Sequence, residues 1–97
     1  MNTIKEIENW YSSQCNGDWE HGKGLELTTI DNPGWRLKIN LVDTGLESRP
    51  FQRLEVERSE SDWFQCWVKD AVFEAACGSK NLEDVLKVFI KWAKAHT

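Results

Sequence analysis

The stretch GWRLKINL, residues 34–41, decides the fold that this 97-residue sequence predicts. Apolar and polar side chains alternate along it, with Trp35, Leu37, Ile39 and Leu41 on one side and Arg36, Lys38 and Asn40 on the other. A period of two residues indicates a β-strand with one buried and one solvent-facing side. Residues 25–30 are typical of a partner strand. We predict a type II turn at Asn32-Pro33-Gly34-Trp35, because proline fixes φ and glycine accepts the positive φ that this turn requires.

A second hairpin is predicted further along the chain. Leu54 and Val56 alternate with glutamates, a polar turn follows at residues 59–62, and residues 63–69 resume the alternation. On this last strand one face carries Phe64, Cys66 and Val68. Residues 71–76 predict a short fifth strand, and residues 43–50 predict a loop.

Helical periodicity is confined to the two ends of the chain. Residues 4–15 predict a helix that begins with a capping box of Thr3 and Glu6 and stops at Asn16-Gly17. Asn81, with Asp84, is expected to cap a second helix, whose apolar stripe contains Leu82, Val85, Leu86, Phe89, Trp92 and Ala93. The order helix, five strands, helix predicts one α+β domain over residues 1–97, with an antiparallel sheet and both helices packed on one face.

The composition restricts the partners and the compartment. Twelve basic and sixteen acidic residues give a net charge of −4, which repels the phosphates of nucleic acids. Three cysteines without regular spacing favour a reducing compartment, and we expect the cytoplasm. We find no apolar run of signal-peptide or membrane-spanning length, so a membrane location is not expected, and no cofactor is predicted.

The stretch CNGDWEHGKG, residues 15–24, raises the question of an active site. Cys15 and His21 could act as nucleophile and base, and Asp18, Glu20 and His21 could bind a metal. A catalytic thiol also needs a group that orients its base, and a zinc site normally shows repeated ligand spacings, which we do not find. The alternative is a folded corner, in which glycines turn the chain, Trp19 fills a gap beside the first helix and a carboxylate bonds loop amides. A tight loop that also contacts a partner remains a third interpretation.

Two tryptophans are expected on the sheet face that the helices leave open. If Phe64, Cys66 and Val68 face the helices, Trp63 and Trp67 point the other way. Two interpretations are open. In the first, the indoles only stack on Arg36 or on cross-strand neighbours; in the second, they form a binding patch, since tryptophan, arginine and carboxylates are typical of interface hot spots. The acidic run over residues 55–62 is either a solvated turn or a mimic of phosphates. Our candidate binding residues are Trp63, Trp67, Glu55, Glu57, Arg36, Lys38, Glu60 and Asp62.

Several motifs together resemble the immunity protein 53 family of bacterial polymorphic toxin systems. They are CNGDWEHGKG, TTIDNPGWRLKINL (28–41), DWFQCWV (62–68), VFEAACGSKNLEDVL (72–86) and FIKWA (89–93). The matched positions are Trp10, Cys15, Gly17, Asp18, Trp19, Glu20, His21, Gly24, Asp31, Asn32, Pro33, Gly34, Trp35, Asp62, Trp63, Phe73, Leu82, Phe89 and Trp92.

This resemblance implies a cytoplasmic, non-enzymatic antitoxin that binds and blocks a cognate toxin domain, with one molecule of each in the complex. Most of the matched positions are expected to be structural. That the toxin is a nuclease with a basic cleft is our hypothesis. The alternative function is a small thiol- or metal-dependent enzyme centred on Cys15, Asp18, Glu20 and His21.

Overall fold

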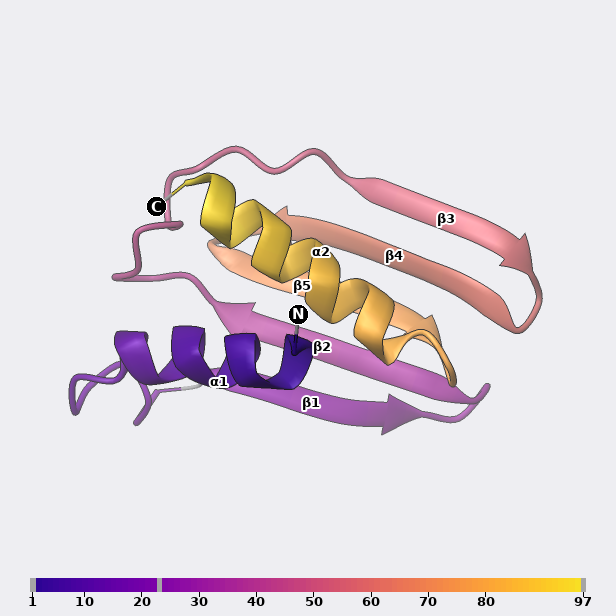
Figure 1. The fold of residues 1–97 in the computed structure, drawn as a ribbon, viewed down its shortest axis with the longest axis horizontal. Helices are drawn as coiled ribbons and strands as arrows, with labels where there is room; N and C mark the ends of the chain where they lie inside the picture. Colours follow the sequence, from indigo (N-terminus) through magenta and orange to yellow (C-terminus); the bar gives the residue numbers. More distant parts are fainter. Residues whose placement is uncertain (1, 23, 97) are drawn as a thin grey trace.

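The computed structural model describes residues 2–22 and 24–96, which form two helices and a five-stranded sheet (Figure 1). The elements follow the predicted order. They are α1 (Thr3–Gln14), β1 (Leu25–Ile30), β2 (Gly34–Asn40), β3 (Leu54–Ser59), β4 (Asp62–Lys69), β5 (Val72–Gly78) and α2 (Leu82–Ala95). The α+β fold class and both hairpins are therefore confirmed.

The sheet is antiparallel throughout, with the strand order β1-β2-β5-β4-β3. The last strand in sequence thus lies in the middle and joins the two hairpins. It extends to Gly78, two residues beyond the predicted end, because both of its edges are paired there: Cys77 lies opposite Trp35 of β2 and opposite Phe64 of β4.

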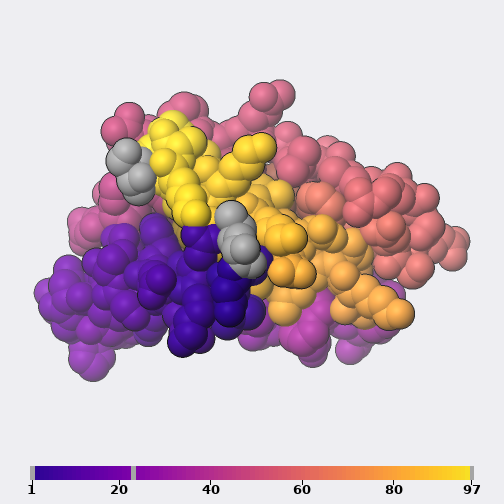
Figure 2. Space-filling view, in the orientation of Figure 1, coloured from indigo at the N-terminus to yellow at the C-terminus, as the bar shows by residue number. Residues whose placement is uncertain are grey.

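Both helices cover the same face of the sheet, as predicted (Figure 1). Seen from that side, α1 and α2 lie next to each other and form much of the surface (Figure 2). Beneath them the core contains side chains that are almost fully enclosed, among them Leu37, Ile39, Phe73, Val85 and Phe89. Burying one such side chain stabilises a fold by about 1.5–3 kcal/mol, so the helices are held mainly by this layer.

The start of α1 differs from the prediction. Asn2, rather than Thr3, is the N-cap, and its side-chain oxygen accepts a hydrogen bond from the backbone N of Lys5 at 3.1 Å. Thr3 is buried, and its hydroxyl donates to a carboxylate oxygen of Glu83 on α2 at 3.1 Å. The predicted capping box is wrong because the packing of α1 against α2 takes up the Thr3 hydroxyl, while Asn2 can supply the cap.

The end of α1 also differs. The helix finishes at Gln14, and Cys15 already has an extended backbone. Gly17 has a φ of +94°, but it lies in the corner beyond the helix and does not terminate it. The positive φ of Gly17 therefore allows a turn within the loop and does not form the C-terminal cap of the helix.

The predicted type II turn is wrong because Gly34 has no positive φ and already belongs to β2. The glycine is required there for another reason. A Cβ atom at Gly34 would lie 2.1 Å from the carbonyl oxygen of Cys77, so any side chain would push β5 away. The close pairing of β2 with β5 therefore explains why position 34 requires a glycine.

Candidate binding surface

The register of the sheet fixes which side chains face away from the helices. Phe64 and Cys66 are buried on the helix side, so Trp63 and Trp67 lie on the other side, as the alternation predicts. The same alternation applies to the strands paired with β4. We call this side the open sheet face; its residues include Glu26, Thr28, Arg36, Lys38, Glu55, Glu57, Trp63, Gln65, Trp67, Lys69 and Glu74.

Trp67, which is partly buried, lies in contact with two guanidinium groups on the open sheet face. The Cζ atoms of Arg36 and Arg53 are 5.3 and 5.0 Å from the centre of its ring. Glu74, the partner of Trp67 in the β4–β5 register, binds Nη2 of Arg36 at 2.5 Å. Each cation–π contact at an exposed site contributes about 0.5–1 kcal/mol. The stacking on Arg36 that the sequence suggested is present, and it fixes the orientation of the indole before any partner arrives.

The indole N–H groups separate the tryptophans into two kinds. Trp19, Trp35 and Trp92 donate to the carbonyl oxygens of Asn40, Ser79 and Pro50, at 3.1, 3.0 and 2.9 Å. For Trp10, Trp63 and Trp67 we find no acceptor within residues 2–22 and 24–96. The ring of Trp10 packs against Trp19 and Phe89, whereas the other two rings lie on the open sheet face. Tryptophan is found at interfaces because its ring is apolar and its N–H still seeks an acceptor. The two indoles of the open sheet face keep that group available.

The end of the open sheet face near β3 is acidic. A hollow of about 670 Å³ is lined by six residues, Glu55, Val56, Glu57, Glu60, Trp63 and Gln65. Glu55 binds Nε of Arg53 at 3.3 Å, and both side chains are more than half exposed. Because water screens such an exposed pair, it contributes at most about 1 kcal/mol to stability. Three of our candidate residues, Glu55, Glu57 and Glu60, therefore gather beside Trp63.

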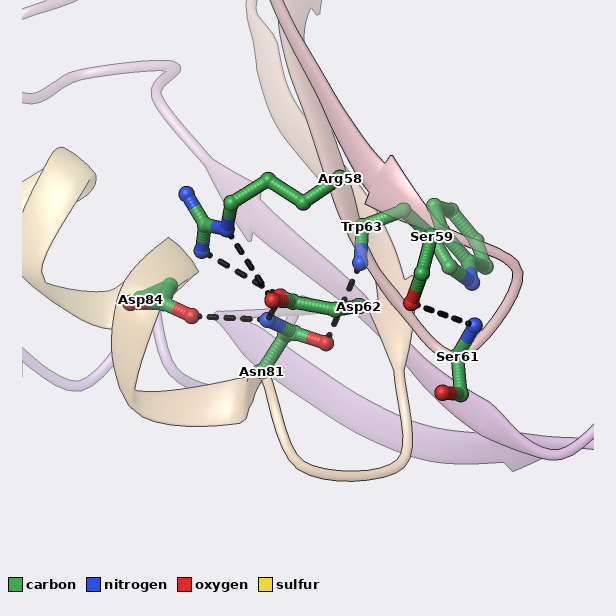
Figure 3. Close-up of polar contacts among 7 residues, drawn as sticks. All are labelled: Arg58, Ser59, Ser61, Asp62, Trp63, Asn81 and Asp84. Carbon is green, nitrogen blue, oxygen red and sulfur yellow. Dashed lines mark hydrogen bonds and ion pairs between the residues drawn. The ribbon is translucent and has the colours of Figure 1, made fainter.

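Asp62 lies elsewhere, because the alternation of β4 turns it toward α2 (Figure 3). Its carboxylate accepts two hydrogen bonds from Arg58, at 3.0 and 3.2 Å, and one from the side chain of Asn81 at 2.9 Å. These bonds, those from Arg58 first, lower the pKa of Asp62 because they favour its ionised form. Asp62 thus holds the β3–β4 turn against α2 and is not brought together with the other candidates.

Asn81 occupies the N-cap position of α2, but its side-chain oxygen accepts no hydrogen bond from a backbone N–H of the first turn of the helix. Its amide group donates to Asp62 and Asp84, both at 2.9 Å, and its oxygen accepts from the backbone N of Trp63 at 3.3 Å (Figure 3). The predicted position of the N-cap is therefore confirmed, but the capping hydrogen bond to the helix backbone is absent. The reason is that Asn81 connects the helix to the second hairpin.

The corner at residues 15–24 is built around Trp19. Its side chain is 5% exposed, and its ring centre lies 5.7 Å from that of Trp10 and 5.5 Å from that of Tyr11. The oxygens of Glu20 accept hydrogen bonds from the backbone N of Asn16 at 2.9 Å and from the next amide at 2.7 Å. Hydrogen bonds from its own amide and from Asn16 lower the pKa of Glu20. The folded-corner interpretation accounts for both residues.

The remaining reactive groups of the corner are exposed and do not converge. The thiol of Cys15 donates to the carbonyl oxygen of Tyr11 at 3.3 Å, and Asp18 and His21 lie at the surface. Among the described residues no group of three or more His, Cys, Asp or Glu side chains is placed to hold a metal ion. The other two thiols are buried, and burial raises the pKa of Cys66 to about 12 and that of Cys77 to about 11.

The loop at residues 43–50 is folded onto the core. Leu46 is buried, and the hydroxyl of Thr44 donates to the carbonyl oxygen of Leu41 at 2.8 Å. The predicted loop is confirmed, and its charged side chains, such as Asp43 and Arg49, are exposed.

No helix within the described part of the chain is long and apolar enough to span a membrane.

Comparison with known proteins gives one match. Neither the curated proteins nor the solved structures include a match to the chain. A family model described as immunity protein 53 matches residues 4–94, which is nearly the whole sequence. The chain therefore belongs to the immunity protein 53 family.

Proposed function

We propose that this immunity protein neutralises a cognate toxin domain by binding it, one to one, through the open sheet face in the bacterial cytoplasm. Membership of the family supports the immunity role. The observation that carries the choice of surface is Trp67, held between Arg36 and Arg53 on the face away from both helices. Neutralisation by coverage of the toxin's active site needs no catalytic group in this chain.

Trp67 has the properties of a binding hot spot. Tryptophan and arginine are the residue types whose removal costs most at interfaces, and they act from the centre of the contact. The ring is already oriented by its two guanidinium neighbours. Binding then requires less ordering of side chains, which otherwise costs about 0.5–1.5 kcal/mol for each flexible group. These properties favour Trp67 over Trp63 as the main anchor.

The acidic end of the open sheet face supports a toxin with a basic cleft, such as a nuclease. Glu55, Glu57 and Glu60 line the hollow beside Trp63, and the chain as a whole has a charge of −4. A nuclease must neutralise phosphates with lysine and arginine, and carboxylates can occupy the same cleft. Opposite charges would also steer the two proteins together and accelerate association.

The proposal predicts that a neighbouring gene encodes a toxin domain, and this domain provides the test. We expect Trp67→Ala to weaken binding about thirtyfold or more in isothermal titration calorimetry, because truncating a hot-spot tryptophan costs at least about 2 kcal/mol. Lys87→Ala, an exposed change on α2, is the control and should bind normally. In stopped-flow experiments at low salt, the double variant Glu55→Lys with Glu57→Lys should associate more slowly than wild type. The difference between the two association rates should shrink at high salt.

Each outcome has a clear meaning. Normal affinity in folded variants with changes at positions 67, 55 and 57 would reject the open sheet face and move the interface to the loop at residues 43–50. Weak binding by Trp67→Ala together with unchanged association of the glutamate variant would keep the surface but reject the steering by charge. A neighbouring toxin without nuclease activity would reject the nuclease hypothesis alone.

A further inference from the structure

The two edges of the sheet differ in their protection against pairing with another strand. On the β3 edge, the register shifts between Glu57 and Ser59, and charged side chains such as Arg58 surround this irregularity. Irregularities and charges of this kind prevent edge-to-edge association. On the other edge, β1 pairs with β2 without interruption over all six residues and carries one charged side chain, Glu26. Only β1 is therefore a regular edge.

The β1–β2 register shows which backbone groups point outward. The backbone N of Asn40 donates to the carbonyl oxygen of Gly24 at 2.8 Å, and this pair continues the register next to Leu25 and Ile39. Hydrogen-bonded and non-hydrogen-bonded pairs alternate in an antiparallel ladder. The N–H and C=O groups of Leu25, Leu27 and Thr29 consequently point away from β2, toward the edge.

Exposed apolar side chains accompany this edge. Leu27 is 42% exposed, and α1 carries two further exposed side chains, Ile4 at 55% and Tyr11 at 37%. Glu6 of α1 forms an ion pair with Lys94 of α2, so the helical spacing turns Ile4 and Tyr11 to the flank opposite α2. Tyr11 indeed lies beside the start of β1, since a Cβ at Gly24 would be 3.6 Å from its ring. Of the four exposed large apolar side chains found in the described residues, one thus belongs to β1 and two share this flank of α1.

We propose that β1 pairs with β1 of a second copy of this chain, antiparallel and about a two-fold axis at Leu27. A two-fold contact brings a surface against itself, so the surface must be self-complementary. With Leu27 opposite Leu27, the strand also sets Leu25 opposite Thr29 and Glu26 opposite Thr28. All the outward backbone groups of Leu25, Leu27 and Thr29 then find partners.

Other registers of the same contact are poorer. An axis at Glu26 places two carboxylates directly opposite, which is destabilising. An axis at Thr28 leaves the outward groups of Leu25 without partners on β1. The Leu27 register avoids both problems and brings the apolar flanks of the two α1 helices toward the axis. It also leaves the open sheet faces of both copies on the same side and uncovered, so the contact is independent of the function proposed above.

The first test measures the mass in solution. We expect wild type to reach twice 11.3 kDa in multi-angle light scattering as its concentration rises. Thr29→Pro removes an N–H that points away from β2, so it breaks no hydrogen bond between β1 and β2. Proline is also tolerated at a strand edge that faces solvent. This variant should be monomeric and folded by circular dichroism, whereas the matched Thr29→Val should dimerise like wild type.

The second test measures the register. In a Cys15→Ser background, Leu27→Cys should form a cross-linked dimer on oxidation, because the paired Cα atoms would lie about 5.5 Å apart, within the range of disulfides. Thr29→Cys is the control and should cross-link little, since Leu25 is its partner. The proposal is overturned by a wild type that stays at 11.3 kDa at its highest soluble concentration, by a dimer that persists in folded Thr29→Pro, or by faster cross-linking of Thr29→Cys than of Leu27→Cys.

Discussion

Two tryptophans, Trp19 in the corner and Trp67 on the open sheet face, show how one residue type can have two different positions in the same small protein. Trp19 is enclosed by Trp10 and Tyr11, and its N–H is bonded to a backbone carbonyl. Trp67 is held by guanidinium groups and has no acceptor for its N–H among the described residues. The internal contacts of Trp19 explain it by stability, while Trp67, on the open sheet face with an N–H that has no acceptor among the described residues, is the one that we propose for binding.

The strongest test of this comparison is Trp19→Ala. Removing a large buried aromatic side chain typically costs about 3–5 kcal/mol, and small domains have only about 5–15 kcal/mol of stability in total. We expect a large loss of stability in chemical denaturation, whereas Trp67→Ala, which removes two cation–π contacts of about 0.5–1 kcal/mol each, should lose clearly less stability. A Trp19→Ala protein that melts like wild type but no longer protects against the toxin would reverse the assignment of the two residues.

A smaller effect should appear in the acid stability of the corner. The pKa of Glu20 is lowered in the folded protein, so its stabilising effect is complete above the ordinary pKa of glutamate, about 4.3, and is lost as the pH falls through the folded value. Glu20→Gln should therefore flatten the decline of the melting temperature in that acidic range. Equal slopes for Glu20→Gln and wild type would show that the loop does not depend on the carboxylate.

The smallest effects are expected from the reactive groups of the corner. Cys15→Ser and His21→Ala change exposed side chains, and coverage of a toxin requires neither a nucleophile nor a proton transfer. Both variants should protect cells that express the toxin as well as wild type does. Complete loss of protection by folded Cys15→Ser would instead support the thiol-enzyme alternative.

Local patterns were sufficient to predict the strands and the orientation of their side chains. Alternation over GWRLKINL and over residues 63–69 reflects burial on one face, and this is why Trp63 and Trp67 could be assigned to the open side. The neighbours of Trp67 were only partly predictable. Arg36 could be proposed from its own strand, but Arg53 and Glu74 are brought in by the order and register of the strands, which local patterns do not encode.

Three errors in the prediction have a common cause, namely contacts between segments distant in sequence. Thr3 looks like a cap, yet its hydroxyl bonds Glu83. Asn81 also looks like a cap, yet it connects α2 to the second hairpin. Gly34 looks like a turn residue, yet it allows β5 to approach. In each case the residue type suits a local role, and the tertiary structure uses the same property elsewhere.

The central position of β5 has a consequence for the order of events during synthesis. Each hairpin is contiguous in sequence and can form soon after it leaves the ribosome, where domains fold as they emerge at about 5–20 residues per second. The inner edges of β2 and β4 remain unpaired until β5 is in place, since both strands pair with it. The group of Arg36, Trp67 and Glu74 draws one residue from each of these three strands, so this surface is complete only when all three strands are paired. Any protection that depends on the surface begins only when β5 has inserted between β2 and β4.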